Sequence, residues 1–441
     1  MRLRHLGIGL AALAMIASAC GDDGGGEQQS LSSEAEESIT PGQYEGETLD
    51  VWIMEGTNPD ATPFFDKVRT AFKEQTGADL NVQFVEWANA YDKFTTGIAG
   101  GELPDVAEVG TTWTPGFADA GGLVDLTDRI EEAGLTDDVV PALLETGELD
   151  GAVYGMPWYS GVRSIVYRTD IFAKAGIKPP QSWDDLAAAC GKLKSAEPDM
   201  VPFPIAGGSE YGVDPFIWGA GGEIATGSGG QWKATLDSDE AREGISYYTG
   251  LATDGGCSTP QASTWDETDL SEAFSAGDAA MIIAGSWTPK ALIEANPDLA
   301  GKIGVFPIPG PDGGLSPSFL GGSHLGIFNT TAKNKLELAW YFVQMMTTGE
   351  FAKTWAKQTG FFPSQSAQLE EMEAADDPLV SPFVTQVLEA GATVPVTPAY
   401  SKIQGNATIT AMLNSILTGK ASVEEATETA NQEMNDVFAS G

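Results

Sequence analysis

The sequence predicts an α/β fold with two lobes, and three observations support this prediction. Strand-like and helix-like segments alternate where the folded part of the chain begins, which indicates a mostly parallel sheet with helices on both faces. Roughly 390 residues follow a polar N-terminal segment, enough for two lobes with separate cores. We find no internal repeat that would indicate a solenoid.

The first elements follow from the spacing of the apolar residues. Phe64, Val68 and Phe72 recur four apart, the spacing of one face of a helix, and Gly77 is placed to end that helix. Leu80 begins a stretch in which apolar and polar residues alternate, as in a strand. We expect strands at 48–54, 80–84 and 105–109, and helices at 63–75 and 90–98.

Three later helices are expected, two of them from the residues at which they start and one, over 335–346, from its apolar face. Ser182 and Ser422 each stand three residues before an acidic residue, the pattern of a capping box. We expect helices from Ser182 to about residue 194, over 335–346, and from Ser422 towards the C-terminus.

The carboxyl ends of parallel strands meet at one edge of a sheet, where ligands of α/β proteins bind. In this chain those ends are at 55–58, 86–87 and 110–113. We therefore expect Glu55, Thr112 and Trp113 to contact a ligand.

The N-terminus is typical of an exported protein. Arg2 and Arg4 precede an apolar stretch that is too short to span a bilayer, so residues 1–19 are predicted to be a signal peptide. Cys20 follows small residues, as in a bacterial lipobox, and 20–47 is a polar tether. These features predict a lipid anchor at Cys20 on the extracytoplasmic face of the cell membrane. The alternative is an ordinary signal peptide that ends in a chance cysteine.

The remaining cysteines are Cys190 and Cys257. Outside the cell, an even pair suggests a disulfide, and two buried thiols are the alternative. Only the geometry can decide between them.

The charge and the scarcity of histidine exclude several kinds of function. The formal net charge is −40, which argues against nucleic acid as a partner. His5 lies in the predicted signal, so a catalytic triad or a zinc site based on histidine would depend on His324 alone. We find no GxSxG, P-loop or CxxC motif. We therefore expect a protein that is not an enzyme and has neither metal nor cofactor. We also expect it to be a monomer.

Four ordered motifs resemble the family 1 extracellular solute-binding proteins, the group that includes maltose-binding protein. They are ELPDVAEVG with GGLVDLTD, DGAVYGMPWYSGVRSIVYRTDIFAKAGIKPPQSWDDL, FSAGDAAMIIAGSW, and GGSHLGIF followed by TGFFPSQ. The resemblance implies a two-lobed fold like the type II periplasmic binding proteins, with a ligand cleft between the lobes. It also implies a role as the sugar-binding component of an ABC transporter, which closes on a di- or oligosaccharide and delivers it to the permease.

The resemblance further implies three crossings between the lobes. We place them near 160–163, 283–286 and 346–348. This division assigns 48–160 and 286–346 to lobe 1, and 161–285 and 347–441 to lobe 2.

A sugar site needs flat aromatic rings for the C–H faces of the sugar and planar polar groups for its hydroxyls. Trp218 and Trp287 match positions at which the family stacks rings on sugars. Arg163 could hold a hydroxyl or carboxylate of the ligand, or pair with a nearby acid and fix the hinge. The expected ligand-binding residues are Glu55, Thr112, Trp113, Trp158, Arg163, Asp214, Trp218, Trp287, Gly322, Ser323 and Tyr400.

Two alternatives remain open from the sequence. The solute could be a polyol, a glycerol phosphodiester or a peptide, because a fold alone does not choose a ligand. A secreted glycoside hydrolase would need two spaced carboxylates, and no acidic pair here matches a recognisable catalytic signature.

Overall fold

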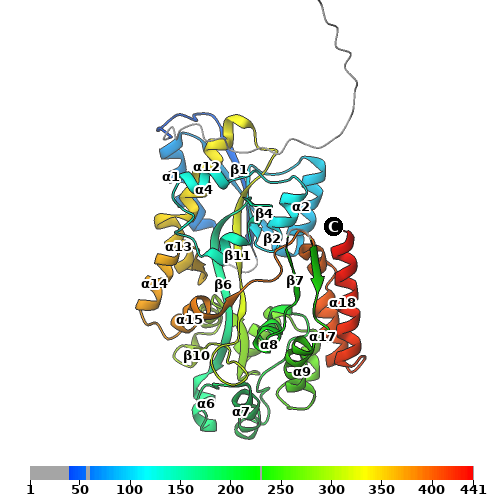
Figure 1. The fold of residues 1–441 in the computed structure, drawn as a ribbon. Coiled ribbons are helices and arrows are strands. Elements are labelled where there is room, and N and C mark those ends of the chain that lie inside the picture. Colours follow the sequence, from blue (N-terminus) through cyan, green and yellow to red (C-terminus); the bar gives the residue numbers. More distant parts are fainter. Residues whose placement is uncertain (1–38, 56–59, 229–230, 441) are drawn as a thin grey trace, which may run out of the picture.

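The computed structural model describes residues 39–55, 60–228 and 231–440. It has two α/β lobes, one above the other, and strands β6 (Met156–Arg168) and β11 (Ser318–Ile327) run between them (Figure 1). The predicted signal peptide, Cys20 and most of the predicted tether lie outside the described residues. No helix in the described ranges has the length and apolar character needed to cross a membrane.

Lobe 1 is built on the sheet that the sequence predicts. β1 (Thr48–Glu55) pairs in parallel with β2 (Asp79–Glu86) and β3 (Val106–Gly110). β11 then pairs antiparallel with both β3 and β6. Since the first three strands are parallel, their carboxyl ends lie at one edge, which faces lobe 2.

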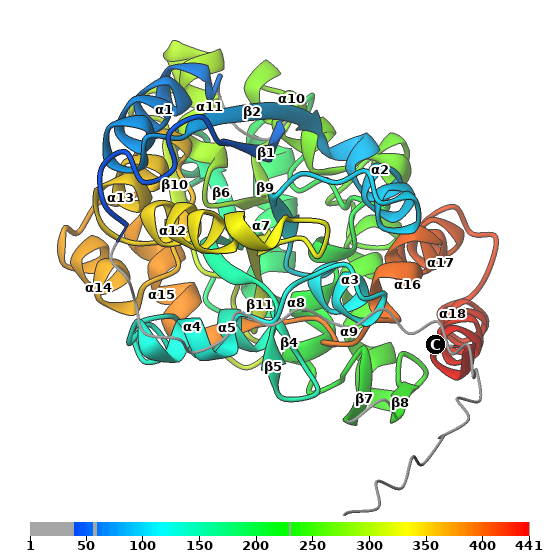
Figure 2. The same ribbon diagram turned by 90° about the horizontal axis from the view of Figure 1, so that it is seen from above.

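Helices cover both faces of this sheet, which confirms the alternating pattern. Helices α1 (Thr62–Thr76) and α12 (Leu336–Thr347) lie on one face, and α2 (Trp87–Gly100) and α3 (Thr114–Asp119) on the other (Figure 2). In α1 the predicted apolar stripe is buried, and Gly77 ends the helix at φ 85° with its N–H donating to the Lys73 carbonyl. The smaller elements of this region are α4 (Thr127–Glu132), α5 (Pro141–Glu145), β4 (Glu148–Leu149), β5 (Ala152–Val153), η4 (Lys333–Lys335), β12 (Phe362–Pro363) and α14 (Ser366–Ala374).

Lobe 2 is built around the second half of β6. There β6 pairs antiparallel with β9 (Met281–Gly285) on one side and β10 (Ile303–Phe306) on the other. One face of this sheet is covered by α6 (Thr169–Ala175), α7 (Trp183–Ala196), α8 (Asp214–Gly219) and α9 (Asp239–Thr253). The other face is covered by α10 (Glu267–Ala276) and α11 (Thr288–Ala295). Short 3-10 turns lie at η1 (Glu210–Gly212), η2 (Pro260–Thr264) and η3 (Pro297–Leu299).

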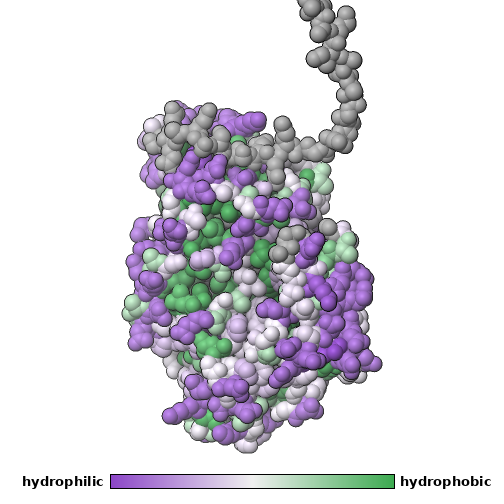
Figure 3. Space-filling view, in the orientation of Figure 1, coloured by the Kyte–Doolittle hydropathy of each residue, from purple (hydrophilic) through white to green (hydrophobic). Residues whose placement is uncertain are grey.

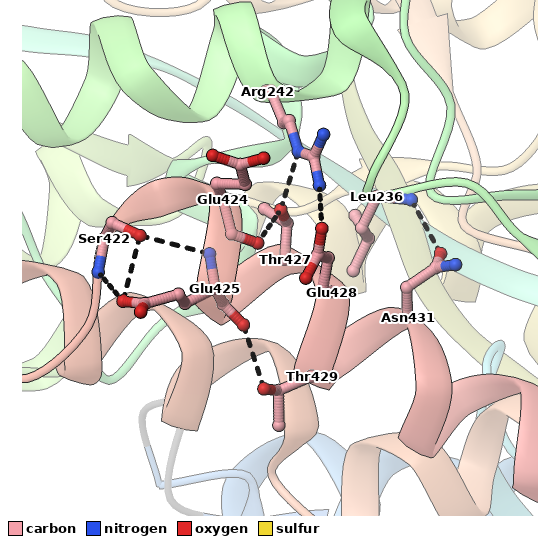
Figure 4. Close-up of polar contacts among 9 residues, drawn as sticks. All are labelled: Leu236, Arg242, Ser422, Glu424, Glu425, Thr427, Glu428, Thr429 and Asn431. Carbon is pink, nitrogen blue, oxygen red and sulfur yellow. Dashed lines mark hydrogen bonds and ion pairs between the residues drawn. The ribbon is translucent and has the colours of Figure 1, made fainter.

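The C-terminal helices complete lobe 2 beside a small hairpin. They are α16 (Tyr400–Gly405), α17 (Thr408–Leu417) and α18 (Val423–Ser440), next to β7 (Ala225–Ser228) and β8 (Gln231–Ala234). The predicted capping box at Ser422 is present: its hydroxyl accepts the Glu425 N–H at 3.2 Å, and its own N–H donates to the Glu425 carboxylate at 3.0 Å (Figure 4). Asn431 accepts the Leu236 N–H at 3.1 Å and so connects α18 to the turn that follows β8.

Ser182 also caps its helix, because its hydroxyl accepts the Asp185 N–H at 3.2 Å. From this helix, Cys190 forms a disulfide with Cys257, with 5.1 Å between the Cα atoms. The predicted bridge is therefore confirmed.

Strand β6 changes its pairing partners near 160–163, where the first crossing was expected. Ser160 of β6 pairs with β11 and with β12, whereas Arg163, three residues later, pairs with Gly285 of β9. The strand therefore changes from lobe 1 partners to lobe 2 partners within 160–163.

The other two crossings differ from the sequence-based division. After β9 the chain stays in lobe 2, because α11 and β10 pack there, so it returns to lobe 1 along β11 and not at 283–286. Helix α13 (Gly349–Thr359) then packs in lobe 1, where Trp355 stacks on Trp158 at 4.8 Å. The last passage follows α15 (Ser381–Ala390), where β13 (Gly391–Ala392) pairs with the start of β11. Residues 286–306 thus pack with lobe 2, and 349–365 with lobe 1.

Candidate ligand-binding cleft

A cavity of about 560 Å³ lies between the lobes, at the carboxyl edge of the lobe 1 sheet. Lobe 1 lines it with α2, the turn after β3, β6 and β11, and lobe 2 with residues of η1, α10 and α16. In Figure 3 hydrophilic side chains dominate both ends of the molecule, and hydrophobic ones gather near its middle on the face shown. The aromatic residues that line the cavity are Trp87, Tyr91, Trp113, Tyr159, Tyr211, Trp287, Phe319 and Phe361.

Trp113 is the centre of an aromatic cluster on the lobe 1 wall. Its ring lies 5.3 Å from that of Trp87 and 5.4 Å from that of Tyr91, both close to edge-on. The turn that follows β3 holds Trp113 there, because its N–H donates to the Gly110 carbonyl at 2.9 Å. These partly exposed rings give the cavity a wall with both flat faces and edges.

Trp287 forms a second aromatic surface and lies over two glycines. A Cβ atom on Gly285 would lie 2.2 Å from the indole, and one on Gly161 would lie 2.6 Å from it. Because glycine has no side chain, these two positions leave room for the indole ring. The centre of the indole ring lies 4.6 Å from that of Phe361, and the Phe361 ring centre lies 4.4 Å from that of Tyr159. A row of rings therefore joins this surface to lobe 1.

Arg163 lies at the crossing strand and is paired with an acid. Its Nε and Nη2 atoms each lie 2.9 Å from a different carboxylate oxygen of Glu267. Its guanidinium also lies 4.3 Å from the centre of the Tyr211 ring and 5.1 Å from that of Trp287. Burial by itself lowers the pKa of Arg163, but the charge and hydrogen bonds of Glu267, together with Tyr211 and Asp214, outweigh burial and raise it, so the side chain stays charged. Of the two alternatives for Arg163, the structure shows the ion pair.

A buried carboxylate lies under the lobe 1 side of the cavity. The Glu108 side chain accepts hydrogen bonds from the Met54 N–H at 2.8 Å, from the Ser323 hydroxyl at 2.8 Å and from the Tyr159 hydroxyl. Burial raises the pKa of Glu108 to about 7, although all three hydrogen bonds act to lower it. Since four strands supply these groups, Glu108 holds together the edge of the sheet that meets the cavity.

A second group of buried acids lies in lobe 2. Burial raises the pKa of Glu210 to about 7, against the opposing effects of the hydrogen bond from Gln404 and of Arg163. The pKa of Asp214 is raised well above its ordinary value, first by burial and then by Glu210. Among the described residues, neither carboxylate oxygen of Asp214 nor the hydroxyl of Tyr400 has a hydrogen-bond partner.

The structure brings together six of the eleven residues expected to bind a ligand. Thr112 and Trp113 line the cavity after β3, as the strand-end rule predicts. Arg163, Trp287, Gly322 and Ser323 also line it, from β6, the turn after β9, and β11.

Two of the expected tryptophan platforms lie elsewhere. Trp158 is 1% exposed, because β6 is buried on both faces there and its ring stacks on Trp355 in the lobe 1 core. Trp218 is 9% exposed and borders a separate hollow of about 190 Å³ with Trp232. These placements correct the expectation that both rings face the ligand.

Three expected polar contacts also lie outside the cavity lining. Asp214 and Tyr400 are fully buried in lobe 2, in the first turns of α8 and α16. Glu55 ends β1 but is not among the lining residues.

Several residues that line the cavity or lie under it were not predicted from the sequence. Glu108, under the cavity, is an acid within an apolar strand, a pattern that could have identified it as a site residue. Phe361 lies in the TGFFPSQ motif. Glu267, Tyr211 and Gln404 left no local signal, since their places depend on tertiary contacts.

His324 has a structural role. It is fully buried on β11, where Thr114 lies 2.8 Å from Nδ1 and Thr146 lies 3.1 Å from Nε2. Burial lowers its pKa to about 4, against a hydrogen bond with the Leu143 carbonyl. No cluster of metal-ligating side chains occurs in the described part of the chain.

Comparison with known proteins agrees with this geometry. Residues 57–353 match the family model described as bacterial extracellular solute-binding protein. The diacetylchitobiose binding protein DasA of Streptomyces coelicolor is 27% identical over 431 residues, covering 95% of each chain. An ABC transporter solute-binding protein of Thermotoga lettingae, solved with alpha-D-tagatose, is 27% identical with a TM-score of 0.78, over 89% of this chain and all of that one. The GacH receptor of Streptomyces glaucescens, at 21% identity and TM-score 0.78, covers 90% of this chain and 99% of its own and supports the fold.

Proposed function

The chain belongs to the bacterial extracellular solute-binding proteins, and from this premise we propose that it captures a di- or oligosaccharide for an ABC transporter. The observation that carries the proposal is the pair of aromatic surfaces, around Trp113 and Trp287, on the wall of one cavity between the lobes. Sugar rings stack their C–H faces on such surfaces, while polar groups beside them bind the hydroxyls. The roles of Thr112, Gly322 and Ser323 as hydrogen-bonding groups are part of this proposal.

The size of the cavity and the named ligands of the relatives support a sugar of this length. A volume of about 560 Å³ lies within the usual range for small-molecule sites. The relatives include proteins named for diacetylchitobiose, lactose and arabinooligosaccharides.

We propose that binding is coupled to closure of the lobes. Tyr91 of lobe 1 and Ser401 of lobe 2 both line the cavity, and their hydroxyl oxygens lie 3.3 Å apart. A ligand that contacts both lobes favours the closed arrangement, because only that arrangement provides both sets of contacts.

Cys20 as a lipid anchor and the polar tether complete the proposal. An anchored, monomeric receptor outside the membrane would stay close to the permease while its tether lets the lobes orient freely. In this scheme the chain binds and releases its solute unchanged and is not an enzyme.

Tryptophan emission and calorimetry would test the proposal with N,N′-diacetylchitobiose, lactose, maltose, an arabinooligosaccharide and the polyol ribitol. We expect at least one saccharide to bind with a Kd near the micromolar range, about −8 kcal/mol. If only ribitol bound, the ligand class would be polyols and not saccharides. If no saccharide bound, the assignment of a saccharide ligand would be refuted. Chromatography of the incubated saccharides checks for cleavage, which would instead indicate a hydrolase.

The Trp287→Ala variant connects the binding to this cavity. We expect it to abolish saccharide binding and to keep a cooperative unfolding transition. Trp232→Ala is the matched control, since Trp232 borders the separate hollow in lobe 2. Equal binding by wild type and the Trp287→Ala variant would remove this surface from the site.

A further inference from the structure

The cavity between the lobes has one cationic side chain among its described lining residues, Arg163. The guanidinium group binds carboxylates through two parallel N–H donors, and here Glu267 occupies one such pair of donors. The rings of Tyr211, Trp287 and Phe319 lie within 4.3 to 5.1 Å of the same guanidinium. The Arg163 charge is thus already neutralised by a group of the protein that itself lines the cavity.

Resting on the proposed function, we propose that Glu267 is a specificity-determining residue that restricts this cleft to uncharged sugars. It occupies the position on Arg163 where the carboxylate of a uronic acid, or another small anion, would bind. The expected substrate class is therefore neutral saccharides, with sugar acids excluded.

The surrounding charges support this inference. Asp92 also lines the cavity, and Asp214 lies close enough to raise the pKa of Arg163. An anionic sugar would therefore enter a site in which the cation is already paired and two acids, Glu267 and Asp92, line the cavity. A neutral sugar avoids this repulsion and can stack on Trp287, because the ion pair leaves the indole partly exposed.

Glu267 is also the partner of this ion pair that can be replaced without moving Arg163. The Arg163 side chain is 8% exposed, whereas the Glu267 side chain is 29% exposed and reaches the cavity from α10. Replacing Glu267 by a smaller residue should leave the guanidinium in place, because β6 and the three rings hold it. The freed donors would then face the cavity as an anion site.

The direct test compares wild type with Glu267→Ala for binding of acetate and sulfate, by calorimetry and by thermal unfolding. We expect wild type to bind neither, and Glu267→Ala to bind at least one at least tenfold more tightly than wild type. The double variant Arg163→Met/Glu267→Ala is the control, since it lacks the cation but retains the general stabilisation that sulfate gives to proteins. Equal anion affinity in the single and the double variant would overturn the proposal.

Two further variants keep the test valid if the alanine variant folds poorly or if a neighbouring acid takes the place of Glu267. Glu267→Gln keeps the size of the side chain and should show a smaller gain, which keeps the test valid if the alanine variant folds poorly. Glu267→Ala/Asp214→Asn covers the case in which Asp214 moves to replace Glu267 on the guanidinium. If none of the folded variants that retain Arg163 gains anion binding, Glu267 does not block an anion site.

A sugar acid extends the test to the substrate class. Digalacturonate and its dimethyl ester differ in charge but little in shape, and we expect the acid, not the ester, to gain affinity for the alanine variant. Tight binding of digalacturonate to wild type would refute the exclusion of sugar acids. The anion experiment needs no saccharide, so failure of the neutral sugars to bind wild type would count against the proposed function alone.

Discussion

Glu108 offers a quantitative test of the structure, through the dependence of stability on pH. Its carboxyl group has an ordinary pKa of 4.5, raised to about 7 in the folded protein by burial. The folded state therefore holds the proton over a pH range in which the unfolded chain has released it. This contribution to stability is fully present below pH 4.5 and is lost as the pH rises through 7.

The perturbation is Glu108→Gln, which keeps the shape and the hydrogen-bonding capacity of the side chain but does not ionise. From the two pKa values, the unfolding free energy of wild type relative to this variant should fall by about 2 kcal/mol between about pH 5.5 and about pH 8. Other titrating groups contribute to both proteins and largely cancel in the difference. Urea unfolding followed by tryptophan emission measures both free energies.

A control variant uses an acid with the opposite shift. The hydrogen bonds from the Ser422 backbone and side chain lower the pKa of Glu425, which caps α18 (Figure 4). The difference between wild type and Glu425→Gln should therefore stay constant over the same pH range. If the difference for Glu108→Gln were also constant, or rose with pH, the carboxyl would not be desolvated as the structure indicates.

Two further predictions concern the cleft and the disulfide. Gly285→Ala should displace the Trp287 indole and weaken saccharide binding, measured by calorimetry, at least tenfold, or about 1.4 kcal/mol. The control is Gly250→Ala, on a helix where a Cβ atom would meet open space. Normal binding by Gly285→Ala would show that Gly285 does not hold the ring in place. Replacing Cys190 and Cys257 by serine should lower the unfolding free energy by about 4 kcal/mol, since the bridge closes a loop with a sequence separation of 67, and should leave saccharide affinity unchanged. A loss of affinity without a loss of stability would contradict the second prediction.

Most of lobe 1 could be predicted from the sequence, because apolar residues recur at different spacings in its helices and its strands. The strand at 48–54 and the helix at 63–75 appear within one residue of their expected limits, as β1 and α1. The rule about strand ends also placed Thr112 and Trp113 at the cavity. Local pattern sufficed there, because the alternation predicts parallel strands, and the carboxyl ends of parallel strands meet at one edge of the sheet.

The rest of the site could not be predicted in this way, because its contacts join distant parts of the chain. Arg163 and Glu267 are separated by 104 residues, and nothing near either one identifies the other as its partner. Trp158 shows a second reason: the first eleven residues of β6 are buried on both faces, so the alternation that would tell a core ring from a cavity ring is lost. The lobe boundaries expected at 286 and 346 were misplaced for the same reason, because they depend on strand pairing and helix packing between distant segments.

The position of the site on the crossing strand explains how binding can act on the lobes. Gly161, under the Trp287 ring, and Arg163 lie on β6 where its partners change from β11 and β12 to β9. A sugar stacked on Trp287 would therefore contact a group whose position depends on the geometry of this crossing. Since the same indole touches Phe361, which packs against Tyr159 of lobe 1, a change in the angle between the lobes would alter its contacts. In the proposed scheme, binding and closure would then be coupled through Trp287 and the crossing strand that it contacts.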